Sequence, residues 1–213
     1  MRNPAMHFSS LTYSVIMIVE EKAEHFESHI RHLHDFFSNL GQGFEIIIIA
    51  NGTEGSTRER IYDINQRSAF IKIFTLYRKN TQAVCMKAAL REAKGDIVIA
   101  CGSYQQITME SLKLALDHLN ADIDMVLPCR RNRVDPPFNQ LQSRFFNHLV
   151  GKITGCRFTD LSCTMRIVRR EVMESIDFYG NMYRFLPVVA ARKGFSFKEV
   201  DADHYKEMGK TGL

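Results

Sequence analysis

The segment DIVIACGSYQ, residues 96–105, sets the fold class of this 213-residue chain. Its apolar run from Ile97 to Ala100 predicts a short strand that is buried on both faces, as in a parallel sheet covered by helices. Open α/β sheets bind ligands in a crevice beyond the carboxyl ends of their strands. Cys101 and Ser103 therefore stand where the chemistry of such a protein is expected, and neither carries a carboxylate.

The rest of the chain alternates between short continuous apolar runs and helical spacing. The expected strands span residues 13–19, 44–49, 71–76, 97–100 and 125–128. The expected helices between them span residues 24–40, 56–67, 82–93 and 109–119. This alternation predicts an α/β fold with a mostly parallel sheet flanked by helices on both faces. It becomes irregular after the strand at 125–128, and residues 135–137 break the chain before an amphipathic helix expected at 140–153.

Length and composition fit one domain over residues 1–213, because a hydrophobic content of 45% supports one sizeable core. No run approaches the ~18 apolar residues of a membrane span, so a soluble cytoplasmic protein is expected. The five cysteines form no CxxC pair, which indicates reduced thiols. The net charge of +4 is modest, and a nucleic-acid partner is not expected.

Basic residues gather in two places, near the middle of the chain and toward its end. They are Arg130, Arg131 and Arg133, followed by Lys193, Lys198, Lys206 and Lys210. This distribution suits a phosphate-bearing ligand or an anionic membrane face. A solvated surface is the alternative at each single position.

Three histidines, His25, His29 and His32, have a helical spacing that could present imidazoles to a metal ion. They lie beside the apolar stripe of the first expected helix, and a solvated helix face is the better interpretation. Two strings, at 122–124 and 201–203, each hold a pair of aspartates. The first precedes a strand, at the wrong edge of the sheet for a crevice site, so the second is the remaining acidic candidate for a metal.

Short motifs recur along the chain in a fixed order. They are found at residues 17–21, 50–53, 78–96, 101–105, 130–133, 143–147, 160–166 and 199–211. In this order they resemble the family-two glycosyltransferases with a GT-A fold, especially the branch of dolichyl-phosphate mannosyltransferases and undecaprenyl-phosphate glycosyltransferases. For example, DLSCTMR at 160–166 is similar to the Asp-x-x-x-Gly-Phe-Arg motif of that family. Each motif alone is weak evidence, whereas their shared order and spacing is strong.

The resemblance implies a Rossmann-like GT-A sheet in which residues 12–128 bind a nucleotide sugar and residues 129–213 face the acceptor. It implies transfer of the sugar to a polyprenyl-phosphate acceptor, with a phospholipid-linked substrate or a membrane surface as partner. It places Asp160, Arg166 and Arg131 in the catalytic role. The resemblance assigns binding of the donor to Glu20, Asn51, Arg78, Ser103, Gln105, Lys206 and Lys210.

Two acidic motifs of that family are altered in this chain. Cys101 and Ser103 replace the Asp-x-Asp pair that holds Mg²⁺ or Mn²⁺ in the family. A thiol is a soft ligand and a hydroxyl carries no charge, so a divalent site is expected to be weak or absent. Ala50 and Asn51 replace the residues that meet the base, so Asn51 either recognises another base or only forms a turn. Placed cations such as Arg166 could supply the stabilisation that the metal otherwise gives.

Three functions stay open on the sequence alone. The first is a metal-independent or metal-weak glycosyltransferase, and the second is a degenerate homologue that binds a nucleotide, a sugar or a partner enzyme without turnover. The third is an unrelated α/β nucleotide-binding protein. Retained basic residues favour the first, and the loss of both acidic motifs favours the second. Asp160 would orient Arg166 or the sugar hydroxyls, or the two would form a buried ion pair between loops.

The amphipathic helix at 140–153 is expected to lie near the acceptor site and to contact lipid or a second subunit. Its apolar residues include Phe145, Phe146, Leu149 and Val150. A homodimer or a membrane protein is therefore a further candidate partner.

Overall fold

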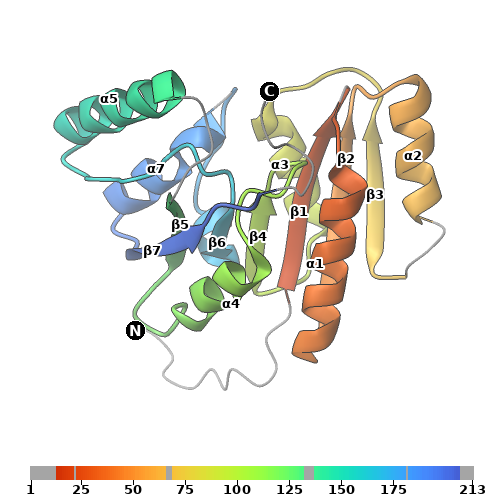
Figure 1. Cartoon of the computed structure of the whole chain (residues 1–213), viewed down its shortest axis with the longest axis horizontal. Helices are drawn as coiled ribbons and strands as arrows, with labels where there is room; N and C mark the ends of the chain where they lie inside the picture. The colour runs from red at the N-terminus through yellow and green to blue at the C-terminus, as the bar shows by residue number, and fades with distance from the viewer. Residues whose placement is uncertain (1–12, 22, 66–68, 132–136, 181, 207–213) are drawn as a thin grey trace.

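The computed structural model describes residues 13–21, 23–65, 69–131, 137–180 and 182–206 (Figure 1). Its strands are β1 (Tyr13–Glu20), β2 (Phe44–Asn51), β3 (Ile71–Leu76), β4 (Ile97–Cys101), β5 (Met125–Arg131), β6 (Arg166–Arg169) and β7 (Phe197–Asp203). Its helices are α1 (Phe26–Leu40), α2 (Gly55–Asn65), α3 (Gln82–Glu92), α4 (Met109–Asp117), α5 (Pro137–Thr154), α6 (Arg170–Glu174) and α7 (Leu186–Arg192), with a 3₁₀ helix η2 (Met182–Phe185).

All these strands form one sheet in the order β3-β2-β1-β4-β6-β5-β7. Neighbouring strands are parallel except where β6 pairs antiparallel with β4 and β5. The chain runs outward from β1 to β2 and β3 and then returns to β4 on the other side of β1. This reversal of strand order opens a crevice at the carboxyl ends of β1 and β4. The predicted mostly parallel α/β sheet is confirmed.

Helices cover both faces of the sheet, and each face has its own apolar core (Figure 1). In β2, Ile46 and Ile48 pack toward α1, α2 and α4, whereas Ile47 and Ile49 pack toward α3, α6 and α7. Successive side chains of a strand point to opposite faces, so four consecutive isoleucines can be buried at once. All four side chains are fully buried, as the continuous apolar run predicts.

The elements after β5 were not predicted, apart from α5. β6 has only four residues and carries an arginine at each end, so it lacks the apolar run that marked the earlier strands. β7 lies at the edge of the sheet and contains the aspartate string at 201–203 inside the strand. Both of those carboxylates are exposed, and Asp201 pairs with Arg131. Among the described residues, none of the helices is long and apolar enough to cross a membrane.

Candidate functional site

A cleft of about 690 Å³ opens at the carboxyl ends of β1 and β4, where the reversal of strand order predicts a site. Glu20 and Glu21 line it at the end of β1, and residues 101–104 line it at the end of β4. Beyond β4 in the sheet, Arg130 of β5 and Arg166 of β6 also line the cleft. Because β6 is antiparallel, its first residue lies at the edge where β4 ends.

The loop after β4 is held firmly at this cleft. The Gln106 side-chain oxygen accepts hydrogen bonds from the Thr164 backbone N–H and hydroxyl, both at 2.7 Å. The Gln105 side-chain oxygen lies 2.7 Å from Nδ1 of His32 on α1. A Cβ atom at Gly102 would lie only 2.9 Å from the Thr164 hydroxyl oxygen, so the two segments approach as closely as glycine allows. The loop therefore faces the crevice, as the family arrangement requires.

The residues of this loop do not fit a divalent cation. The Cys101 thiol points to the backbone oxygen of Ile16, 3.7 Å away, and burial raises the pKa of Cys101 to about 12. It is therefore a neutral thiol at physiological pH, and only a thiolate binds metals well. Ser103 adds an uncharged hydroxyl at the cleft. Within the described ranges, no three side chains of His, Cys, Asp or Glu gather closely enough to hold a metal ion.

The two carboxylates at the end of β1 are engaged in local structure. A carboxylate oxygen of Glu20 lies 2.8 Å from Nζ of Lys79, which belongs to the segment that follows β3. Glu21 accepts hydrogen bonds from the Glu54 backbone N–H at 2.6 Å and from the Thr57 hydroxyl at 3.2 Å. These contacts fasten β1 to the segments that follow β2 and β3. Much of the negative charge on this side of the cleft is thus neutralised or already hydrogen-bonded.

Asn51 is fully buried at the end of β2. Its side-chain oxygen accepts a hydrogen bond from the Asn80 backbone N–H at 2.8 Å, and its amide nitrogen donates to the Asn80 carbonyl at 3.0 Å. Gly52 follows with φ of 63°, and a Cβ atom there would lie 2.7 Å from the backbone nitrogen of Lys79. The Asn51-Gly52 string therefore forms the tight turn that was the alternative interpretation. Contact between Asn51 and a base stays a prediction, and it would require the Asn80 bonds to open.

Asp160 forms a buried ion pair with Arg130. The two side chains are 4% and 3% exposed, and the Arg130 Nε lies 2.8 Å from a carboxylate oxygen. The second guanidinium nitrogen, the Ser162 hydroxyl and the Cys163 N–H also donate to this carboxylate. The hypothesis that Asp160 orients or pairs with Arg166 is wrong, because Asp160 holds Arg130 instead. The reason is the strand order, which brings the end of β5 against the loop at 160–163.

Arg166 is buried and holds the η2 segment in place. Its guanidinium donates to the backbone carbonyls of Tyr183 and Arg184, and it stacks 5.0 Å from the Tyr183 ring centroid. Burial lowers the pKa of Arg166, yet an arginine retains its charge in proteins. Arg184 itself is exposed and lines the cleft. Sequence reasoning missed Arg184, because a single cation in a short 3₁₀ helix leaves no periodic signal.

The cleft brings together only some of the residues that the sequence assigned to the site. Its lining includes the predicted Glu20, Ser103 and Arg166, together with Arg130 and Arg184. Six others lie outside its lining, and their assigned roles in the reaction or in donor binding stay predictions: Asn51, Arg78, Gln105, Arg131, Asp160 and Lys206. Lys210 lies outside the described residues.

The histidines of α1 are placed differently from the expected solvated face. His29 is buried, and neither ring nitrogen has a hydrogen-bond partner among the described residues. Burial lowers the pKa of His29 to about 4, against a smaller opposing effect from the Gly102 backbone. His32 is engaged with Gln105, and only His25 is exposed. The predicted solvated face therefore holds for His25, whereas His29 is buried and His32 contacts the loop after β4.

This strand order, with a crevice where β1 and β4 end, is the GT-A fold of nucleotide-sugar transferases. A solved structure of mannosyl-3-phosphoglycerate synthase from Rubrobacter xylanophilus shares it, with a TM-score of 0.71 over 94% of this chain and 68% of that one, at 15% identity. Glucosyl-3-phosphoglycerate synthase from Mycobacterium tuberculosis, in complex with Mn²⁺, UDP and phosphoglyceric acid, matches with a TM-score of 0.69 over 92% and 72%, at 16% identity. At these identities the likeness defines the fold alone.

The chain belongs to glycosyl transferase family 2, whose sequence model matches residues 14–177. It is 28% identical to the undecaprenyl-phosphate 4-deoxy-4-formamido-L-arabinose transferase of Aeromonas hydrophila, over 82% of this chain and 55% of the relative. It is 26% identical to the dodecaprenyl-phosphate galacturonate synthase of Rhizobium johnstonii, over 70% of this chain and 45% of the relative. The chain therefore spans about half the length of the curated relatives it matches.

Proposed function

We propose that this chain transfers a sugar from a nucleotide sugar to a polyprenyl phosphate, with weak or no dependence on a divalent metal. The acceptor class is supported by the names of the curated relatives, both of which act on polyprenyl phosphates. The observation that carries the proposal is the cleft itself, where three arginines and a carboxylate-free loop meet at the reversal of strand order.

The chemistry of transfer needs positive charge near the leaving nucleoside diphosphate. Arg184 offers an exposed guanidinium to the cleft, and guanidinium groups bind phosphates with two parallel hydrogen bonds. Arg166 lies behind it as a buried cation whose hydrogen bonds go to neutral carbonyls, whereas the charge of Arg130 is compensated by Asp160. The acceptor phosphate is already an anion at neutral pH, so no strong general base is required. These features support a reaction in which fixed cations do the work that a metal ion does elsewhere.

The acceptor side of the proposal is supported by α5, at the outer end of the molecule (Figure 1). Phe146 and Val150 pack inward, with the Phe146 ring 5.9 Å from that of Phe185, so these two do not contact lipid as predicted. Leu141, Phe145 and Leu149 are 65%, 69% and 44% exposed. Residues four apart lie on one face of a helix, so these three form a stripe, which we call the α5 stripe. An exposed apolar stripe beside the cleft suits contact with a bilayer.

The tail that follows β7 is proposed to close over the donor phosphates. The Tyr205 backbone N–H donates to the Gln106 carbonyl at 3.1 Å, so the segment leading to Lys206 runs beside the loop after β4. Replacing Lys206 and Lys210 by alanine should lower the affinity for nucleoside diphosphates. Unchanged affinity in calorimetry would remove the tail from the site.

The proposal is tested by a transfer assay with the full chain, a panel of nucleotide sugars, and polyprenyl phosphate in vesicles. We expect glycolipid product in the presence of EDTA, with little stimulation by Mn²⁺ or Mg²⁺. Calorimetry with the same nucleotide sugars should show binding in EDTA. Turnover that requires Mn²⁺ would contradict the metal-independent mechanism. Binding without turnover across the panel would contradict the transferase itself and favour the degenerate homologue.

A further inference from the structure

A second cavity, of about 630 Å³, lies between α5 and the segment that follows it. It shares no lining residue with the cleft. From α5 it is lined by Asn147, His148 and Lys152, and from the following segment by Arg157 and Thr159. We call this cavity the α5 pocket. The proposed transfer reaction does not use it.

The α5 pocket is basic. His148, Lys152 and Arg157 are all exposed at it, and none of its lining residues is acidic. Within the described part of the chain, neither Lys152 nor Arg157 forms an ion pair. Glu199 reaches the neighbouring Thr159, whose N–H and hydroxyl donate to its two oxygens at 2.7 Å and 2.8 Å. This carboxylate keeps its charge, but the two cations Lys152 and Arg157 outnumber it, so the pocket favours an anion such as a phosphate.

Asn147 joins the two walls of the α5 pocket. The residue is 7% exposed, and its amide nitrogen donates to the Thr159 carbonyl at 2.6 Å, which ties the segment after α5 to the helix. The amide oxygen is itself buried, so a ligand in the pocket does not reach it. The groups that a ligand meets are therefore the exposed basic side chains, which suit a phosphate.

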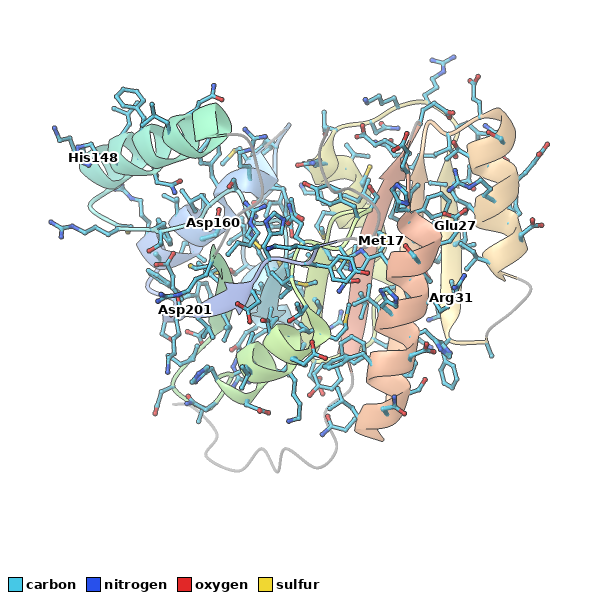
Figure 2. All side chains as sticks on the ribbon, in the orientation of Figure 1. Met17, Glu27, Arg31, His148, Asp160 and Asp201 are labelled. Carbon is cyan, nitrogen blue, oxygen red and sulfur yellow. The ribbon has the colours of Figure 1, made fainter. Side chains whose placement is uncertain are left out.

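The position of the pocket favours a lipid over a free phosphate compound. His148 and Lys152 each follow a member of the α5 stripe by three residues, so the cations and the apolar side chains share one outer face of the helix. Figure 2 shows His148 on α5 at the outer edge of the molecule. In a bilayer, the stripe would enter the acyl boundary while the cations stay at the level of the headgroups. A free phosphate compound would leave the stripe in water.

We propose that the α5 pocket binds the headgroup of an anionic phospholipid, with phosphatidylglycerol as the test lipid, and that this contact docks α5 on the membrane. Lys152 and Arg157 would meet the lipid phosphate. The docking needs neither the nucleotide sugar nor the polyprenyl phosphate. It therefore stands or falls separately from the transfer reaction.

The test is flotation of the full chain with vesicles that contain no polyprenyl phosphate. Vesicles of phosphatidylcholine mixed with phosphatidylglycerol are compared with vesicles of phosphatidylcholine alone, and glycerol phosphate is titrated separately by calorimetry. We expect the chain to bind the mixed vesicles about tenfold more tightly than vesicles of phosphatidylcholine alone, because each basic side chain near an anionic surface adds to the attraction. Equal binding to both vesicles would overturn the proposal. Binding of glycerol phosphate without vesicle binding would overturn it as well.

Matched variants separate the pocket from the overall charge. Lys152→Ala with Arg157→Ala should abolish the preference for phosphatidylglycerol, whereas Arg91→Ala with Lys113→Ala removes the same charge from α3 and α4 and should keep it. If both double variants lose the preference for phosphatidylglycerol equally, the preference depends on net charge alone, and the proposed role of the α5 pocket is wrong. Leu141→Ser with Leu149→Ser should weaken binding to both vesicle types while the preference survives. Thermal unfolding of each variant checks that its fold is intact.

Discussion

The two sides of the cleft carry opposite charges that are used in different ways. On the β1 side, Glu20 and Glu21 are exposed or partly exposed and serve to tie loops together. On the far side of β4, Arg130 is buried in its pair with Asp160, and the buried Arg166 supports the segment from which Arg184 lines the cleft. The carboxylates are thus occupied, while one cation stays available. This difference supports the proposal that the site binds a phosphate ligand with weak or no dependence on a metal.

The two sides also differ in what their ion pairs contribute to stability. An ion pair exposed to water adds little to the stability of the fold, because solvent screens the attraction and two flexible side chains lose conformational freedom. A buried pair gives little net stability when intact, but removing one partner leaves an uncompensated charge in the interior. The comparison therefore predicts unequal effects for equivalent substitutions, as follows.

The largest effect is expected for Asp160→Ala, which leaves the Arg130 guanidinium buried without its carboxylate. The free energy of unfolding should fall by about 3–5 kcal/mol. The matched control is Glu20→Ala, which breaks the exposed Lys79 pair and should change stability far less. Urea denaturation of both variants measures the difference. Similar losses in the two would show that burial does not separate the two sides.

The next effect concerns His29, which supports the loop between the two sides. Its pKa is about 4 in the folded chain, below the ordinary value near 6.5, so the unfolded chain binds more protons between these values. The free energy of unfolding therefore has its full value above about pH 6.5, where His29 is neutral in both states. It falls as the pH drops toward 4, by about 2 kcal/mol at about pH 5. His29→Leu should remove this part of the acid sensitivity, whereas His148→Gln, at an exposed histidine, should not. Urea denaturation at about pH 7.5 and pH 5 makes the comparison. Parallel curves for wild type and His29→Leu would rule out a buried neutral imidazole.

A smaller effect is expected when negative charge is returned to the loop. Cys101→Asp with Ser103→Asp supplies two carboxylates at the end of β4, where the wild-type chain has a protonated thiol and a hydroxyl. Hard divalent cations prefer carboxylate oxygens, so Mn²⁺ should now raise the affinity for a nucleoside diphosphate by about tenfold. The wild type should show little change with Mn²⁺ in the same calorimetric titration. A tenfold gain in the wild type would contradict the metal-weak site.

The smallest effect is expected for Arg184→Ala, on the arginine side. Its guanidinium is exposed, so solvent weakens each contact that it makes with a phosphate. We expect the affinity for a nucleoside diphosphate to fall about fivefold, with partial recovery in Arg184→Lys. Arg192→Ala, which removes an exposed cation from α7, is the control and should leave the affinity unchanged. If both alanine variants lose affinity equally, the effect is one of net charge and not of the cleft.

The part of the fold that the sequence predicted well is the half built from regular alternation. The strands β1, β2 and β4 are apolar runs buried largely on both faces, and β3 is a mostly apolar, partly buried run at the edge of the sheet. These signals depend only on near neighbours in the chain. β6 and β7 gave no such signal, because one is very short and the other lies at the edge of the sheet with alternating exposure.

The candidate site divides in the same way. The loss of the acidic pair at Cys101 and Ser103 could be predicted from residue types, as could the place of that loop at the end of a buried strand. The partner of Asp160 could not, since Arg130 lies 30 residues away and meets it only because β5 and the loop at 160–163 converge. The burial of Asn51 could not be predicted either, because it depends on the contact with Asn80, which is 29 residues away.

The sequence by itself therefore determined the α/β alternation, the family and the presence of Cys101 and Ser103 where the family has its acidic pair, because residue type and short-range spacing carry that information. Only the tertiary structure decided which charges pair, which cations face the cleft and which side chains of α5 reach the surface. Those outcomes depend on strand order and on contacts between distant segments. A hydrogen bond or an ion pair forms where two groups meet in space, and spacing along the chain does not fix where that is.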